Sequence, residues 1–214
     1  MKSIAMFVKT AVLLLLAATS ARATSILDVT GALTLADPTQ LGRLSRNGVP
    51  QDWAGGEGPF PGVLNPATTY HYHTYFVGTG GTPFIQISVD SLSAFTFFSA
   101  YDTSYLPNSA GGPNFGFDAH WLGDAGTSGD LVPGDPLFFQ VVVPLGHTLA
   151  IVVNNTAAGN VGVGDPFHLI VEGFTDTEFT DPTADTPIPA PEPATLLLGA
   201  TGLAAIARAR RKRM

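Results

Sequence analysis

The chain has 214 residues, of which 45% are hydrophobic and only 13% are charged, and it contains no cysteine, so any stable domain must rely on a packed core. Its basic residues lie almost entirely in the first 23 and last seven positions, leaving residues 24–191 with two arginines against 16 of the 17 acidic residues, a formal charge of −14. Because such a surface repels a phosphate backbone, nucleic acid is excluded as a partner.

Residues 1–23 have the three parts of a secretory signal peptide. A basic segment is followed by an apolar run over residues 10–19, and the small residues Ala21 and Ala23 stand where signal peptidase requires them. The alternative is a retained membrane anchor, but about ten apolar residues in a helix span only about 15 Å, half of a bilayer core. We therefore predict a signal-peptide helix, cleaved after Ala23 so that Thr24 becomes the first mature residue.

Residues 24–174 are predicted to form one all-β domain. Short apolar and aromatic runs, separated by glycine and proline, indicate strands, and no sustained 3.6-residue period indicates a helix. A β-sandwich, jelly-roll-like, is the expected architecture. The expected strands are 68–77, 84–89, 93–101, 136–143, 147–154 and 167–174.

Metal sites in this domain compete with ordinary structural explanations. His71 and His73 are two residues apart on a predicted strand, so they share one face, but the sequence offers no third ligand. His120, His147 and His168 stand alone. Aspartates in residues 123–130 and 133–136 offer oxygens that calcium accepts, although turn chemistry explains them equally well. We predict no metal and no cofactor.

Catalytic signatures are not found in the sequence. It has no G-x-S-x-G, H-E-x-x-H or P-loop motif, and the separation of two carboxylates for glycoside hydrolysis cannot be read from it. We predict no catalytic residues and a protein that is not an enzyme. The alternative to a purely structural domain is a binding module for polysaccharide or protein, in which exposed Trp53, Trp121 and tyrosines form a platform. Buried indole rings would argue against that platform.

Residues 175–190 are rich in threonine, aspartate and proline and are predicted to form an extended linker. Pro191, Glu192 and Pro193 follow, and the two prolines should keep this tripeptide extended, with Glu192 as its one charged side chain. Residues 194–207 are all apolar or small and give about 21 Å of helix, a short transmembrane span. The basic residues after it should stay in the cytoplasm. They are Arg208, Arg210, Arg211, Lys212 and Arg213.

The order of these three parts, Pro-Glu-Pro, then "ATLLLGATGLAAIA", then "RARRKR", resembles the PEP-CTERM sorting signal of exported bacterial proteins. The resemblance covers about 25 residues and implies two membrane partners, signal peptidase and an exosortase-like transpeptidase that reads the motif. It also implies transient insertion in the inner membrane, followed by placement at the cell surface or release. Extracellular polysaccharide is a further candidate partner.

The central domain is similar to the β-sandwich modules that follow secreted peptidases, the pre-peptidase C-terminal type. Residues 121–128, "WLGDAGTS", and 143–147, "VPLGH", occupy the places of that family's loop and late strand pair, within about 110 similar residues. The chain departs from the family in having no cysteine pair and no attached peptidase. The sequence thus predicts an exported, non-catalytic surface or matrix protein, with a secreted binding module as the alternative.

Overall fold

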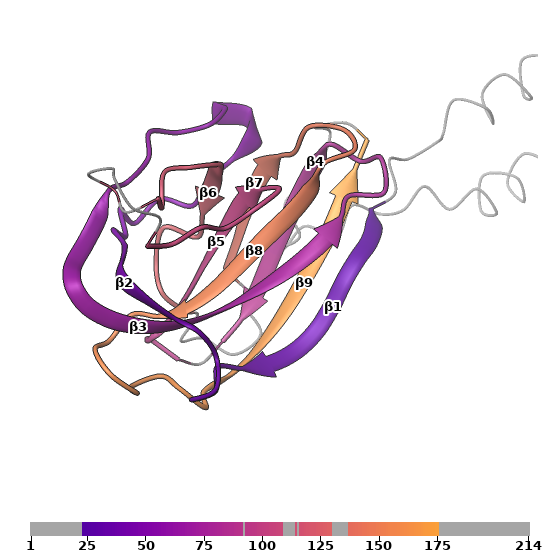
Figure 1. The fold of residues 1–214 in the computed structure, drawn as a ribbon. Helices are drawn as coiled ribbons and strands as arrows, with labels where there is room; N and C mark the ends of the chain where they lie inside the picture. Colours follow the sequence, from indigo (N-terminus) through magenta and orange to yellow (C-terminus); the bar gives the residue numbers. More distant parts are fainter. Residues whose placement is uncertain (1–22, 92, 109–113, 115, 130–136, 176–214) are drawn as a thin grey trace, which may run out of the picture. The chain divides into compact units, whose positions relative to one another are not determined.

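The computed structural model describes residues 23–91, 93–108, 114, 116–129 and 137–175, and these residues form two antiparallel β-sheets with one short 3-10 helix (Figure 1). One sheet has the order β1-β9-β4-β7 and the other β2-β3-β8-β5-β6. The elements are β1 (Thr24–Ala32), β2 (Thr39–Leu44), η1 (Trp53–Gly55), β3 (Val63–Gly78), β4 (Phe84–Asp90), β5 (Thr96–Asp102), β6 (Trp121–Asp124), β7 (Leu137–Val142), β8 (Thr148–Asn155) and β9 (Pro166–Phe174).

The strands pair as a nested set, with β2 added at one edge. β1 pairs with β9, β3 with β8, β4 with β7, and β5 with β6, all antiparallel. This nested pairing places the described strands in two sheets, so the prediction of an all-β domain is confirmed. One consequence is that Thr24 lies opposite Gly173, so the first and last strands of the domain begin and end side by side.

The main hydrophobic core lies between the two sheets. Ile85 and Ile87 of β4 and Val171 of β9 contribute from one sheet, and Phe98 of β5 and Ile151 of β8 from the other, all fully buried. Each such side chain contributes about 1.5–3 kcal/mol by leaving water, so the core stabilises the fold without a disulfide. A smaller cluster lies on the other face of the second sheet, where aromatic side chains pack together. It contains Phe97, Tyr101, Tyr105, Phe117 and Trp121.

All six predicted strands are confirmed in place, but three strands were missed. The strand β1 is an edge strand whose register shifts between Ser25 and Leu27, and its inward-facing position 31 is a glycine. The register of β2 shifts between Leu41 and Arg43, at Gly42. The segment 121–124, interpreted as part of a loop, is the four-residue edge strand β6. In each case pairing with a strand distant in the sequence supplies the structure that the local pattern does not.

The chain divides into two compact units, residues 1–179 and 180–214. The second unit, the predicted signal-peptide helix and the predicted apolar helix of residues 194–207 lie outside the described residues. Within the part of the chain that the structure describes, no helix is long and apolar enough to cross a membrane. The first described strand begins at Thr24 and the last ends at Phe174, and the domain bounds of 24 and 174 stay a prediction.

Candidate functional site

The sorting residues predicted from the sequence fall mostly outside the described ranges. Ala21 lies there, as do Pro191, Glu192, Pro193 and the basic residues from Arg208 to Arg213. Ala23 and Thr24 are described and exposed, and Thr24 is the first residue of β1. Cleavage after Ala23 would therefore leave the first strand complete, and the roles of these residues stay predictions.

A cavity of about 460 Å³ lies where the edge strands of the two sheets meet. Trp121 and Leu122 of β6 and Val142 of β7 line it, and the segment around η1 contributes Trp53 and Glu57. The volume is in the range of small-molecule sites, which are about 300–1,000 Å³. Both β6 and β7 are edge strands of their sheets in the described part of the chain, and the cavity lies beside them.

The polar wall of this cavity is acidic. Glu57, Asp102 and Asp118 all line it, together with His120, and no lysine or arginine does. The only two cations in residues 24–191, Arg43 and Arg46, are engaged elsewhere: Arg43 donates to the carbonyl oxygen of Leu44 at 3.0 Å, and Arg46 donates to the hydroxyl of Ser128. The cavity therefore favours neutral or positively charged groups over anions.

The backbone at the rim of the cavity is strained at two positions. His120 has a φ of 63° and Thr103 has a φ of 66°. Both values lie in the left-handed region, which residues other than glycine rarely adopt. Two short backbone hydrogen bonds fix the corner formed by residues 102, 103 and 120. The amide of Asp102 donates to the carbonyl oxygen of His120 at 2.7 Å, and the amide of Thr103 donates to the carbonyl oxygen of Thr148 at 2.7 Å. The Asp102 carboxylate accepts a hydrogen bond from His147 Nδ1 at 2.8 Å. The corner thus holds Asp102 and His120 at the cavity wall.

The exposed tryptophan platform predicted for the binding alternative is wrong. Only 9% of Trp53 and 6% of Trp121 is exposed. Trp53 packs edge-on against Phe84 and Phe174, each at 5.8 Å between ring centroids, and Trp121 packs edge-on against Phe60 at the same distance. A flat sugar-stacking face needs open rings. These residues are instead among those that line the cavity.

Asp124 is a buried carboxylate beside this site. It lies at the end of β6, is 2% exposed and lines a second cavity of about 240 Å³ under residues 47–59. Burial raises its pKa to about 6, although the amide of Gly126, which donates to Oδ1 at 2.8 Å, and the Trp121 side chain lower it in part. Asp124 is therefore mostly protonated below about pH 6 and mostly ionised above it.

Stability should fall as the pH rises through about 6 because of Asp124. Its folded pKa is above its ordinary value of 3.8, so its contribution is fully present below about pH 4 and is lost above about pH 7. The shift corresponds to about 3 kcal/mol. Asp124→Asn keeps the acceptor for Gly126 but does not titrate. We expect the free energy of unfolding of this variant, relative to that of wild type, to rise by about that much from pH 4 to pH 8, as measured by urea unfolding. Glu57→Gln, at an exposed carboxylate, is the control, and an unchanged pH profile for Asp124→Asn would contradict the assignment.

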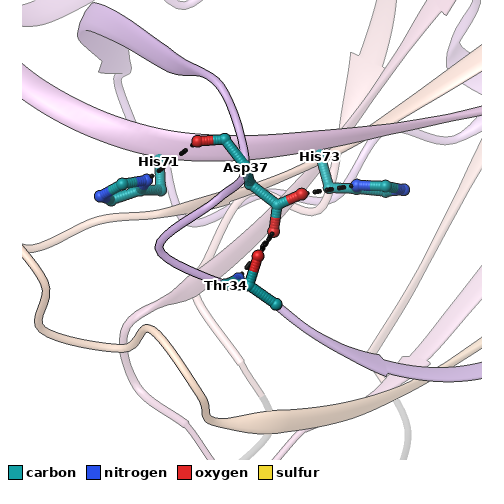
Figure 2. A network of polar contacts seen from close by, with 4 residues as sticks. All are labelled: Thr34, Asp37, His71 and His73. Atoms are coloured by element: carbon teal, nitrogen blue, oxygen red, sulfur yellow. Dashed lines mark hydrogen bonds and ion pairs between the residues drawn. The ribbon is translucent and has the colours of Figure 1, made fainter.

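The two histidines singled out as possible metal ligands share one partner (Figure 2). His71 Nδ1 donates to the carbonyl oxygen of Asp37 at 3.2 Å, and His73 Nδ1 donates to its carboxylate at 2.9 Å. Burial would raise the pKa of Asp37, but hydrogen bonds from His73 and Thr34 hold it below its ordinary value. The His-x-His pattern thus has a structural role here, fixing the turn between β1 and β2 on β3.

Neither suggested calcium loop supplies a ligand cluster within the described ranges. Asp124 is buried and accepts from Gly126, while Asp130 and residues 133–136 lie outside those ranges. Among the residues that the structure describes, no three histidine, aspartate or glutamate side chains are grouped to hold a metal ion.

The acidic cavity itself was missed by sequence reasoning. Asp102 and Asp118 are 16 residues apart and Glu57 is a further 45 residues away, so only the packing of η1, β5 and β6 brings them to one place. The sequence did contain one indication of it. Residues 24–191 have few lysines and arginines, so a cavity in this domain is expected to be negatively charged.

The comparisons with known proteins concern the other end of the chain. No curated protein matches the chain. One family model does match, that of the PEP-CTERM protein-sorting motif, over residues 189–212. The match does not reach the sandwich, whose resemblance to the pre-peptidase C-terminal type stays a prediction. It supports export and sorting, with an exosortase as the type of partner. Residues 189–212 of this chain are therefore a PEP-CTERM protein-sorting motif.

Proposed function

We propose that the protein is an exported, non-catalytic surface or extracellular-matrix protein whose tail is a processing signal. The observation that carries the proposal is the PEP-CTERM motif at residues 189–212. In this proposal signal peptidase removes residues 1–23, and residues 194–207 then hold the chain in the inner membrane. An exosortase reads Pro191, Glu192 and Pro193 and releases the domain from the apolar segment.

The fold supports this order of events in one respect. β1 pairs with β9, the last strand to be made, and Thr24 lies opposite Gly173. The predicted signal-peptidase site, after Ala23, therefore directly precedes β1. Because β1 pairs with β9, its pairing is complete only after the whole domain has crossed the membrane. The peptidase has access to Ala23 before that pairing forms. Thr24, where the predicted signal peptide ends, and Gly173, just before the predicted linker, lie opposite each other in the β1-β9 pair.

The predicted tether would separate the domain from the membrane. Residues 175–190 number 16, and an extended proline-rich segment rises about 3.1 Å per residue, so the linker reaches about 50 Å. That length keeps Pro191 to Pro193 accessible to a membrane enzyme after the sandwich has folded.

Transplanting the tail tests the proposal. Residues 175–214 fused to an unrelated exported protein should send that protein to the same processed surface or released fraction in the native host. The same fusion carrying Glu192→Ala is the control and should stay full-length in the membrane fraction. Fractionation and immunoblotting measure both. If the two fusions distribute alike, the motif is not read and the proposal is wrong.

A further inference from the structure

We propose that Arg43 and Arg46 form a site that binds one phosphate group, either as the free ion or as an ester on a sugar. Such binding would be a property of the folded domain, independent of the sorting of the protein by its tail. The burial of one arginine, the closeness of the second, and the lack of an acidic partner for either of them support it.

Arg43 is buried without a negatively charged partner. It lies in β2 opposite Leu64 of β3 and is only 8% exposed. Among the described residues its one hydrogen bond joins Nη1 to the carbonyl oxygen of Leu44, and its Nε is enclosed without any partner. Arginines are almost never fully buried unless they are paired, because an uncompensated buried charge is strongly destabilising. A ligand that carries negative charge would supply the missing partner.

A second guanidinium lies close to that of Arg43. Burial lowers the pKa of Arg46, and the positive charge of Arg43 lowers it further. Arg46 is itself exposed, and its Nη1 donates to the hydroxyl of Ser128, whose oxygen lies 3.5 Å from the hydroxyl oxygen of Thr156. The end of β2, the segment after β6 and the end of β8 thus bring two positive charges and two hydroxyls together.

No carboxylate in the described part of the chain neutralises the two arginines. The three ion pairs found there each join a histidine to an aspartate, and none includes an arginine. Acidic residues are not scarce, since residues 24–191 contain 16 of them against these two arginines. The fold therefore leaves its only two strong cations open to a negative group from outside the domain.

The charge of the site and of its surroundings selects a single phosphate group. Two guanidiniums carry two positive charges, and a phosphate monoester carries about −1.5 to −2 near pH 7, whereas a carboxylate carries only one negative charge. Guanidinium groups bind phosphate oxygens through paired N–H donors, and hydroxyls can donate to an oxygen that remains. A polymer with many negative charges would be repelled by residues 24–191, whose formal charge is −14. A free phosphate, or one phosphate on a neutral sugar, would not.

Isothermal titration calorimetry of the full chain in a neutral detergent tests the site. At about pH 7.5 and constant ionic strength, we expect inorganic phosphate to bind saturably and acetate to bind at least about tenfold more weakly. Glucose 6-phosphate distinguishes the two sources of the group. Binding of this ester at least as tight as that of inorganic phosphate would identify an ester as the occupant, and weaker binding would identify the free ion.

Two matched double variants locate the site. Arg43→Gln with Arg46→Gln should remove measurable binding of phosphate, whereas Arg208→Gln with Arg210→Gln removes the same charge from the tail and should leave binding unchanged. Because Arg43 is buried, the exposed Arg46 is also changed alone, and Arg46→Gln should weaken binding by about tenfold. No saturable heat with phosphate, equally tight binding of acetate, full binding by Arg46→Gln, or an equal loss in the two double variants would overturn the proposal.

Discussion

Replacing Gly126 with alanine should cost the domain at least about 4 kcal/mol of unfolding free energy, a loss in the exceptional range for one substitution. A Cβ at this position would lie 2.4 Å from the carbonyl carbon, 2.5 Å from the oxygen and 2.6 Å from the nitrogen of Val49. These are backbone atoms that cannot rotate away. The residue also has a φ of 69° and its carbonyl accepts from the amide of Gly48 at 2.9 Å, so the close approach is part of the fold.

A second glycine separates the clash from the backbone conformation. Gly80 has a φ of 62°, but a Cβ there would meet no atom within 4 Å. We expect Gly80→Ala to cost about 1 kcal/mol, the conformational part alone. Urea unfolding of the two variants, made in the chain from Thr24 onward, measures the difference. Equal costs would mean that residues 47–50 do not lie against Gly126 as described.

Glu192→Ala should remove most of the processing of the tail. The proposed exosortase site contains one charged side chain. Without it, the polar groups of the enzyme pocket that binds it would be left unpaired. In related cases of recognition, such a loss lowers the catalytic efficiency toward the altered substrate by about two orders of magnitude or more. We expect full-length protein to accumulate in the membrane fraction and the released form to fall by at least about tenfold, as measured by immunoblotting of fractions.

Glu178→Ala is the matched control, because it removes the same charge from the predicted linker outside the motif. It should be released like wild type. Deleting residues 208–213 should also block release or misplace the protein, since the basic cluster fixes the orientation of the span. Release of the Glu192→Ala protein at the wild-type level would show that the glutamate is not read.

The fold was predictable where the local pattern and the final burial agree. "FIQISV" at residues 84–89 alternates strictly and became β4, with buried Ile85, Ile87 and Val89 in the core. The strand β6 was not predictable, because its four residues contain a glycine and gain their structure from pairing with β5. Edge strands satisfy half of their hydrogen bonds and bury less surface, so their sequences carry a weaker signal.

The candidate sites differ in the same way. The tail could be predicted because its motif, apolar run and basic cluster are contiguous, and a physical reason exists for each part in that order. The acidic cavity could not be predicted, because Glu57, Asp102 and Asp118 meet only after the sandwich has folded. The histidine pair shows the opposite case. The sequence placed His71 and His73 on one face correctly, but Asp37, the residue that binds both, comes from 34 residues earlier in the chain.

The mass of the protein that the native host releases tests the central claim most directly. Trypsin finds no lysine or arginine between Arg46 and Arg208, so the C-terminal region gives one large fragment that begins at Asn47. If the tail is a processing signal, this fragment ends near Pro191 to Pro193 and lacks residues 194–208, and the intact protein begins at Thr24. A released or surface form whose fragment continues to Arg208, in a host with a working exosortase, would show that the apolar segment is a permanent anchor.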